Sequence, residues 1–549
     1  MPEDNKFTIK IESILGGHAP TTHFASADQF RNSIGIDPSL PINDASDDPF
    51  SFIASGLLRP TAYSEFGDTV GAPQWIIEPP NKRNVTGIFY VYDSDGSVYS
   101  FNATATPTLT GLGDLNDGGS ASGNGAAYYD NYVYFARDTT IARYGPLDSV
   151  SPAFTDDYWV TTLGKTALTD TGYSLAGNGI LPNHVLHRHS DGKLYIADVV
   201  GNQGTIHYIA TTKTTVEGDT DNGSTYSKIQ VGYGLYPTAI ESYGSNLVIS
   251  FIETTNTGGV APRAKLAFWD TTSQNINQII WVEFPDPLIS GLKNINGILY
   301  VISGKVRNSS PANSGFRVSK FIGGYTFEEV FYSELGDPSI SGAMDGTSKR
   351  LLIGSAGRSP DAGVSTAGVG CVYSIGLQKA LLSQGLFNIA GATTANSYIS
   401  ALHIPSATNL LRFDLPYIGL RKVSTATGAI AYPSENYSNA VSTMWWSQLY
   451  RIGQPFKITK IRFPLAQAVS VGMIVTPKIY TDDGAGTAYT LTTINDTNDL
   501  GKFNIVRRSG SSGEVITGQH NFWVECKWSG GSLCTVGLPI TIDYELLDD

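Results

Sequence analysis

The sequence has few charged residues, few cysteines and no long apolar run. Charged residues make up 15% of the chain, Lys and Arg together number 36, and the net charge is −13. A nucleic-acid-binding protein needs a basic stripe to neutralise phosphates, so we expect no sequence-specific binding of nucleic acid. No apolar run reaches the roughly 18 residues that a membrane span needs. Three cysteines in 549 residues cannot form a disulfide framework.

The N-terminus also lacks a recognisable export signal. Its first residues, MPEDNKFTIK, are charged where a signal peptide has an apolar segment. The chain nevertheless has 59 glycines and is rich in Ser, Thr, Asn and Tyr, a composition typical of proteins that work outside cells. Assembly in a host cytoplasm followed by release through lysis reconciles the two observations, and virus particles are made in this way. We therefore expect the protein to be located in a virion.

A strand–turn–strand unit recurs along the middle of the chain and predicts an all-β fold. In each unit a first strand, a polar turn and a second apolar strand follow one another. The second strands recur every 43 to 62 residues, close to the length of a four-stranded propeller blade or somewhat above it. The units occupy residues 73–93, 123–137, 182–198, 237–250, 288–304, 339–355 and 398–414.

Third strands follow several of these units, some of them after tight turns such as Asp95-Gly96. A small twisted sheet cannot cover both of its apolar faces, whereas sheets packed around an axis cover one another. The sequence therefore predicts a β-propeller, most simply with seven blades; six or eight blades stay open because the first and last units are the least regular. The expected third strands are Ser97–Phe101, Thr205–Ile209, Ala264–Trp269, Arg317–Phe321 and Val369–Ile375.

Four segments are expected along the chain: an N-terminal arm (1–44), the propeller (45–430), a linker (431–455) and a C-terminal domain (456–549). The arm has one strand within irregular Gly/Pro-rich chain, so we expect it to find strand partners on a neighbouring subunit.

Six strands with clear turns predict that the C-terminal domain is an antiparallel β-sandwich of jelly-roll type. Three aromatic residues, Trp445, Trp446 and Tyr450, are expected to pack it against the propeller. Short helices are expected at Ala27–Ser33 and Leu377–Ser383.

Two clusters of polar residues are candidate metal sites. His187 and His189 share a strand face beside His184, but no carboxylate or cysteine stands at a useful spacing, so we expect a structural role. The acidic stretch EGDTDNGS (217–224) resembles half of a calcium loop. It lacks the glycine position and the closing Glu of an EF-hand, so we expect a solvated loop.

Cysteine and tyrosine residues give no further site. Cys526 and Cys534 flank a Gly-Gly turn that directs their side chains to opposite faces, so we expect no disulfide, and Cys371 is expected in the core. No G-x-S-x-G, H-E-x-x-H, Walker or C-x-x-C motif occurs, and we assign no catalytic, cofactor-binding or metal-binding residue. Loop aromatics that could stack on sugars, although ordinary packing is the simpler expectation, are Tyr158, Tyr173, Tyr226, Tyr233 and Tyr236.

Two stretches near the N-terminus carry a family resemblance. They are ESILGGHAPTTHF (12–24) and IASGLLRPTAYSEF (53–66), the second with a small residue, Gly, two further residues and Arg-Pro before the first repeat. This opening resembles that of phage virion proteins that join an arm, a β-propeller and a C-terminal β-sandwich, such as tail nozzle or hub proteins of short-tailed phages. The resemblance implies a structural role and a ring-shaped homo-oligomer, with no catalytic residues to carry over.

The expected function is therefore that of a non-enzymatic structural component of a bacteriophage tail or portal vertex, without a cofactor. Its expected partners are other virion proteins and further copies of itself, with a host-surface glycan as an additional candidate. The main alternative is a carbohydrate-active propeller, a lyase or hydrolase whose sandwich binds sugar. It predicts a deep pocket with paired carboxylates and aromatic platforms. A third reading is a receptor-binding protein without turnover.

Overall fold

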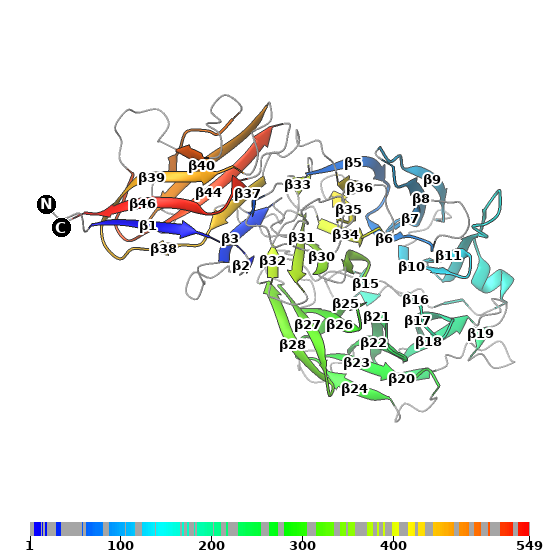
Figure 1. Ribbon diagram of the computed structural model, residues 1–549. Coiled ribbons are helices and arrows are strands. Elements are labelled where there is room, and N and C mark those ends of the chain that lie inside the picture. Colours follow the sequence, from blue (N-terminus) through cyan, green and yellow to red (C-terminus); the bar gives the residue numbers. More distant parts are fainter. Residues whose placement is uncertain are drawn as a thin grey trace. The chain divides into compact units, whose positions relative to one another are not determined.

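The computed structural model is all-β, as expected (Figure 1). Among the described residues, no helix has the length and apolar character needed to cross a membrane. The structure describes residues 5–12, 14, 17–18, 29–34, 57–58, 62–80, 87–104, 106–115, 123–137, 139–164, 167–168, 173–174, 180–181, 184–200, 203–209, 216–217, 229–253, 263–272, 279–304, 315–333, 341–346, 350–356, 370–376, 381–383, 388–389, 398–405, 415–422, 427–433, 443–465, 472–482, 488–495, 503–505, 516–530 and 536–547.

The chain divides into two compact units. Unit 1 comprises Met1–Ser64, Cys371–Thr393 and Tyr432–Asp549, and unit 2 comprises Glu65–Gly370 and Thr394–Ala431. The predicted limits of the arm, propeller, linker and C-terminal domain stay predictions.

Antiparallel sheets follow one another along the middle of the chain, each built mainly from strands that are consecutive in sequence. The first two are β6(Pro73–Ile77)-β7(Ile88–Asp93)-β8(Ser97–Asn102)-β9(Thr110–Asp114) and β10(Gly123–Tyr129)-β11(Tyr132–Arg137)-β12(Thr140–Gly145)-β13(Ala153–Thr155). The third is β16(Leu186–Arg188)-β17(Leu194–Val200)-β18(Gln203–Ile209)-β19(Val216–Glu217), with β20(Ile229–Tyr233) also on β18. Next come β21(Leu235–Tyr243)-β22(Asn246–Glu253)-β23(Ala264–Trp269)-β24(Ile280–Glu283) and β25(Leu288–Ile295)-β26(Ile298–Gly304)-β27(Phe316–Gly323)-β28(Thr326–Ser333).

Of the last two of these sheets, the first again consists of consecutive strands, and only the second includes a strand from a distant part of the sequence. One is β29(Met344–Gly346)-β30(Arg350–Ala356)-β31(Gly370–Gly376)-β32(Leu381–Ser383). The other is β33(Asn388–Ile389)-β5(Ala62–Thr69)-β36(Thr427–Pro433)-β35(Tyr417–Lys422)-β34(Tyr398–His403). Along the sequence, the second and third sheets are separated by the π-helix η1(Tyr158–Thr162) and the hairpin β14(Tyr173–Ser174)-β15(Ile180–Leu181). The short 3-10 helix η4(Ser341–Ala343) precedes β29.

The first strands of these sheets form a closed ring. Each of β6, β10, β16, β21, β25, β29 and β34 contacts the next, and β34 contacts β6 in turn (Figure 1). Strand β5, which precedes the first sheet in sequence, pairs in the last sheet beside β36, so the two ends of the ring are joined by hydrogen bonds. A closed ring of antiparallel sheets is a β-propeller. The expected third strands lie within β8, β18, β23, β27 and β31.

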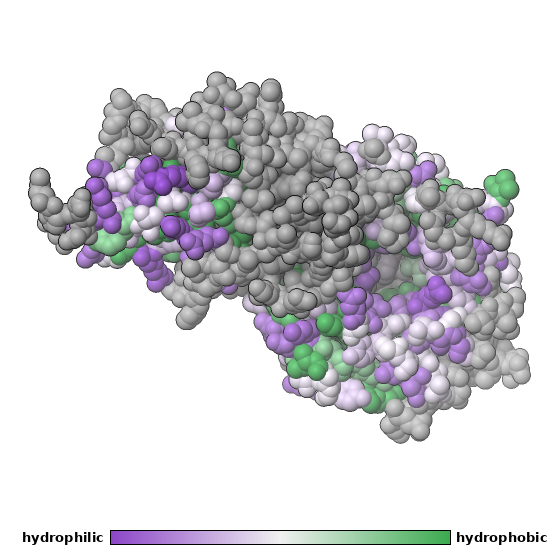
Figure 2. Space-filling view, viewed as in Figure 1, coloured by the Kyte–Doolittle hydropathy of each residue, from purple (hydrophilic) through white to green (hydrophobic). Residues whose placement is uncertain are grey.

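Neighbouring sheets of the ring bury one another's apolar faces. One core cluster combines Tyr92 and Val98 of the first sheet with Val133 and Phe135 of the second. Similar clusters join the third sheet to the fourth and the fourth to the fifth. Central strands are therefore apolar on both faces, as the continuous buried run of β22 shows. On the face seen in Figure 2, the described residues of β21–β28 are mostly hydrophilic with small apolar spots.

Unit 1 contains two sheets that share one apolar core. The first is β1(Lys6–Ile11)-β46(Ile540–Leu546)-β39(Phe456–Pro464)-β42(Phe503–Ile505), with β43(Ile516–Gly518) also on β39. The second is β2(Gly17–His18)-β3(Gln29–Ile34)-β37(Thr443–Ser447)-β44(Asn521–Gly530)-β40(Met473–Thr481)-β41(Ala488–Thr490), with β38(Tyr450–Arg451) on β44. A small sheet pairs β4(Leu57–Leu58) with β45(Val536–Gly537). The core contains side chains from both large sheets, among them Ile461 and Ile542 from the first and Val475 and Trp528 from the second. The jelly-roll topology stays a prediction.

The N-terminal strand finds its partner in its own chain. All six residues of β1 pair antiparallel with β46, and the Leu546 N–H donates to the Asn5 carbonyl at 3.0 Å. Figure 1 shows β1 and β46 side by side at this edge. We expected such strand partners on a neighbouring subunit, whereas the described part of the arm, through β1 and β3, belongs to the core of unit 1.

Two local expectations were wrong. Instead of a helix over Ala27–Ser33, residues from Gln29 onward form strand β3, because Phe30 is buried in the core of unit 1 and the backbone pairs with β37. Instead of a helix over Leu377–Ser383, its last three residues form β32, which pairs with β31.

The aromatic residues Trp445, Trp446 and Tyr450 pack within unit 1, where Trp446 lies 4.9 Å from Trp523 between ring centroids. Their expected packing against the propeller stays a prediction.

Candidate functional site: the polar ring of the first strands

The first strands of three sheets share a short sequence pattern. Each has Ser or Thr, a small residue, an apolar residue and a charged or titratable residue: Thr238–Glu241 in β21, Ser290–Lys293 in β25 and Ser400–His403 in β34. A β-bulge falls at the Ser or Thr in all three strands. Because a bulge redirects the residues that follow it, the same position in each strand presents its polar side chain to the ring.

The Ser and Thr positions link one sheet to the next. The Thr238 hydroxyl donates to the Ile289 carbonyl of the next sheet at 2.6 Å, and the Leu292 N–H donates to the Ser341 hydroxyl at 3.3 Å. Gly342, directly after Ser341, allows a further close approach, of η4 to β6, since a Cβ at Gly342 would lie 2.0 Å from the Gln74 carbonyl oxygen. These contacts hold the first strands so close together that polar side chains from neighbouring strands can interact.

Six titratable side chains meet in this way, and we call them the polar ring: Glu78, His187, Glu241, Lys293, Asp345 and His403. Glu78 directly follows β6, and the other five come from β16, β21, β25, β29 and β34. All six belong to unit 2.

Acidic and basic side chains alternate along one side of the polar ring. His403 Nε2 lies 2.9 Å from Glu78 Oε2, and His403 Nδ1 lies 3.4 Å from Asp345 Oδ2. Lys293 Nζ lies 3.4 Å from Asp345 Oδ1. The Ile404 N–H donates a further hydrogen bond to Asp345 Oδ2 at 2.7 Å. His403 and Lys293 therefore hold Asp345 between them.

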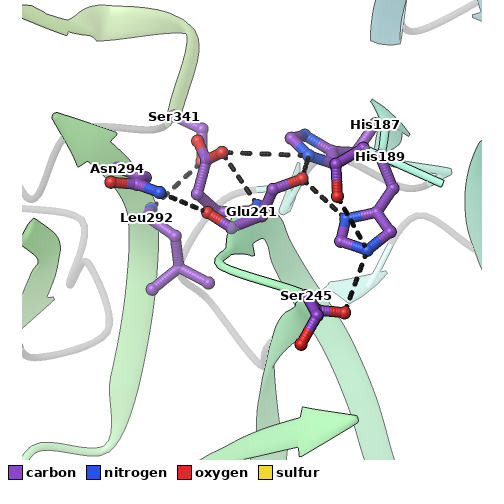
Figure 3. A network of polar contacts seen from close by, with 9 residues as sticks. His187, His189, Glu241, Ser245, Leu292, Asn294 and Ser341 are labelled. Atoms are coloured by element: carbon purple, nitrogen blue, oxygen red, sulfur yellow. Dashed lines mark hydrogen bonds and ion pairs between the residues drawn. The ribbon is translucent and has the colours of Figure 1, made fainter. Parts of the chain in front are cut away.

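The other side of the polar ring is organised by one serine. Ser242 Oγ lies 2.7 Å from His187 Nε2 and 2.8 Å from His189 Nδ1. His187 Nε2 lies 3.8 Å from Glu241 Oε1. In Figure 3 Glu241 lies between the two histidines on one side and Asn294 and Ser341 on the other. The Asn294 side-chain amide donates to the Ser242 carbonyl at 2.8 Å, which ties β25 to β21.

Burial and neighbouring charges shift the protonation of these groups. Burial raises the pKa of Glu241 to about 7, although Lys293 works in the opposite direction. Burial, His189 and Lys293 lower the pKa of His187 to about 3, so this imidazole is neutral near pH 7. The exposed fractions of the two side chains are 16% and 19%, so little water reaches them.

The remaining charges of the polar ring stabilise one another. Burial alone would raise the pKa of Asp345, but Lys293 and His403 outweigh it and the pKa is lowered. Asp345, followed by Glu241, raises the pKa of Lys293. An ion pair between Lys293 and Asp345 is thus maintained at neutral pH, while Glu241 is the carboxyl group that can exchange a proton there.

Two of the three predicted histidines lie together. His187 and His189 share Ser242, whereas His184 points elsewhere, with Nδ1 3.4 Å from Asp198 Oδ1. His207 Nε2 lies 3.7 Å from the other oxygen of the same carboxylate. Within the ranges that the structure describes, no group of His, Cys, Asp and Glu is arranged to hold a metal ion.

The other candidates had mixed outcomes. Cys526 is buried as a free thiol, and Tyr233 is 73% exposed. Tyr158, expected in an exposed loop, is buried in η1, where the Arg143 guanidinium lies over its ring. Tyr236 is half-buried in β21. The candidates that lie outside the described residues, or whose side chains do, are Glu217, Asp219, Asp221, Cys371, Cys534, Tyr173 and Tyr226.

Sequence reasoning missed Glu78, Glu241, Lys293, Asp345 and His403. The signal was present, because aligning the first strands of the repeats puts Glu241, Lys293 and His403 in one column. Residues at equal positions in blades meet around the axis of a propeller, so such a column of charged residues in otherwise apolar strands indicates an axial site.

Comparison with known proteins adds resemblances at the level of the fold. The sequence matches no family model, and no curated protein sequence is similar to it. Similar solved structures include the Neurospora crassa Pan2 WD40 domain (9% identity, covering 68% of this chain and 96% of that chain, TM-score 0.39). Others are the WD40 β-propeller domain of Doa1 (11%, 68% and 97%, 0.38) and the N-terminal domain of Nup159 (10%, 68% and 94%, 0.37). At these TM-scores no functional conclusion follows.

Proposed function

We propose that this chain is a non-enzymatic structural component of a bacteriophage virion, in the tail or at the portal vertex. In this proposal the ring of sheets is a seven-bladed propeller, one blade for each first strand of the ring, and acts as a rigid protein-binding scaffold. The family resemblance of residues 12–24 and 53–66 supports the virion location. Partners are other virion proteins and further copies of the same chain, which would form a ring.

The observation that best supports a scaffold is the pairing within the polar ring. His403 lies within 3.4 Å of both Glu78 and Asp345, and Lys293 forms an ion pair with Asp345, so these side chains are partners of one another. A glycoside hydrolase needs two carboxyl groups that face a substrate, one as acid and one as base or nucleophile. Glu78 and Asp345 instead face the same imidazole. Such a network suits an axis that holds blades together.

Light scattering of the purified chain and mass spectrometry of purified virions test this proposal. We expect a ring-shaped homo-oligomer in solution and several copies of the chain per particle. A monodisperse monomer that is missing from the particles would contradict the proposal. The carbohydrate-active alternative predicts that the purified chain degrades polysaccharides, and release of reducing ends or unsaturated sugars would favour it.

A further inference from the structure

A pocket with an aromatic lining lies between the first two sheets of unit 2. Its volume is about 330 Å³. One wall includes Tyr90 and Ser100 of the first sheet, and the opposite wall includes Tyr128 and Tyr144 of the second. The remaining lining residues are Pro79, Pro80, Ile88, Leu112, Asn131, Leu147, Ser149 and Pro152. This volume is at the lower end of the range for small-molecule pockets and can take one or two sugar rings.

Among the described residues that line the pocket, none has a charged side chain, and such a lining favours an uncharged ligand. An ionic ligand would lose hydration there without gaining a counter-ion. The apolar surface comes from tyrosine and proline rings, which offer flat faces to the C–H groups of a ligand. The occupant is therefore expected to be neutral and to have at least one apolar face.

Hydroxyl groups in the pocket are available to such a ligand. Within the described part of the chain, the hydroxyls of Tyr90, Tyr144 and Ser100 have no protein hydrogen-bond partner, whereas the Tyr128 hydroxyl accepts from the Asn131 N–H at 3.1 Å. The Tyr90 and Tyr144 rings lie 5.8 Å apart between centroids, tilted by 54°. Burial and the nearby Tyr144 raise the pKa of Tyr90 to about 12, so both phenols stay protonated and can donate.

We propose that this pocket binds a neutral glycan, with a pyranose ring held between the aromatic walls and its hydroxyls bonded to Tyr90, Tyr144 and Ser100. A polyhydroxylated ring needs donors and acceptors together with a flat apolar face, and protein hydroxyls serve in both hydrogen-bonding roles. A proline-rich peptide would also contact aromatic rings, but it has few hydrogen-bond donors for these hydroxyls to accept from. The site stands apart from the scaffold role and does not depend on it.

The test uses the full-length chain on an array of neutral and acidic oligosaccharides, followed by titration with the strongest neutral one. The double variant Tyr90→Phe/Tyr144→Phe keeps both rings and removes only the two hydroxyls. We expect it to bind about tenfold more weakly, as the loss of two hydrogen bonds implies. Tyr332→Phe, which changes an exposed tyrosine of β28, is the matched control and should bind like the original chain.

Three results would overturn the inference: silence across the array, binding of acidic glycans only, or neutral-glycan binding that the double variant leaves unchanged. Displacement of the bound oligosaccharide by decaproline, with tighter binding of decaproline itself, would reassign the pocket to a peptide. The oligomeric state and the particle composition are measured separately, so the scaffold proposal can fail while this one survives.

Discussion

Glu241 is largely buried, and the backbone N–H of Asn294 is among its hydrogen-bond partners, but no cation is devoted to it alone. Its carboxylate accepts the Ser242 N–H at 2.9 Å and lies 3.8 Å from a histidine that is neutral near pH 7. The nearby Lys293 is already shared with Asp345. A carboxyl group in this position costs least when it is protonated.

This arrangement predicts a pH-dependent cost to stability. Because the pKa of Glu241 rises from 4.5 to about 7 on folding, the folded state binds more protons than the unfolded state between these values. The contribution of Glu241 to the free energy of unfolding therefore falls as pH rises through this window. Glu241→Gln keeps an acceptor and removes the charge, so its stability relative to the original chain should increase from pH 4.5 to pH 7.

Denaturant unfolding at several pH values measures this difference. Glu283→Gln in β24, where the side chain is 61% exposed, is the control and should show a small difference throughout. A Glu241→Gln difference that stays flat from pH 4.5 to pH 7 would show that the ionised carboxylate is well accommodated in the ring.

At the scale of single elements, strand β1 shows how the N-terminal segment is held. Its inward side chain Ile11 is 1% exposed in the core of unit 1, whereas its neighbour Lys10 is exposed. Alternation of this kind means that one residue of the strand carries most of the packing energy.

We therefore expect Ile11→Ala to lower the free energy of unfolding by roughly 2–5 kcal/mol, the usual cost of such a deletion in a well-packed core. Lys10→Ala, at the next position of the same strand, should change it by less than about 0.5 kcal/mol. Chemical denaturation of the two variants makes the comparison. Equal effects would mean that β1 is not an integral part of this core.

Strand type was more predictable than strand partner. The alternation and turn residues of the repeats identified the strands of unit 2, because these properties are local. The partners of β1 and β5 could not be predicted, because each pairs with a strand hundreds of residues away. At Ala27–Ser33 the local pattern resembled a short helix. The segment instead contributes to a strand, because Phe30 is buried and the backbone pairs with β37. For the same reason, local patterns could not predict the contacts of the polar ring, because these contacts join residues from blades that are far apart in the sequence.

At the scale of the whole ring, stability depends on the junction between the last sheet and the first. Strand β5 pairs in the last sheet and the chain then leads directly into β6. Gly428 of β36 lies against this passage: a Cβ there would come within 2.3 Å of the Gly71 carbonyl oxygen and 2.4 Å of Pro73 Cδ. The Thr69 hydroxyl oxygen would also lie 2.3 Å from this Cβ, and neither the Gly71 backbone nor the Pro73 ring can move aside as the end of a flexible side chain would.

Gly428→Ala should therefore loosen the junction and lower the free energy of unfolding by roughly 1–3 kcal/mol, the range seen for overpacked sites. Gly111→Ala in β9 is the matched control, since a Cβ there meets no atom within 4 Å.

Hydrogen exchange of the same variant measures closure of the ring more directly. Because β6 contacts both β34 and β35, loss of protection in Gly428→Ala should appear in β6 and in β34–β36 together. Loss confined to β36 would instead mean that the sheets open one at a time and that closure adds little to the stability of the propeller.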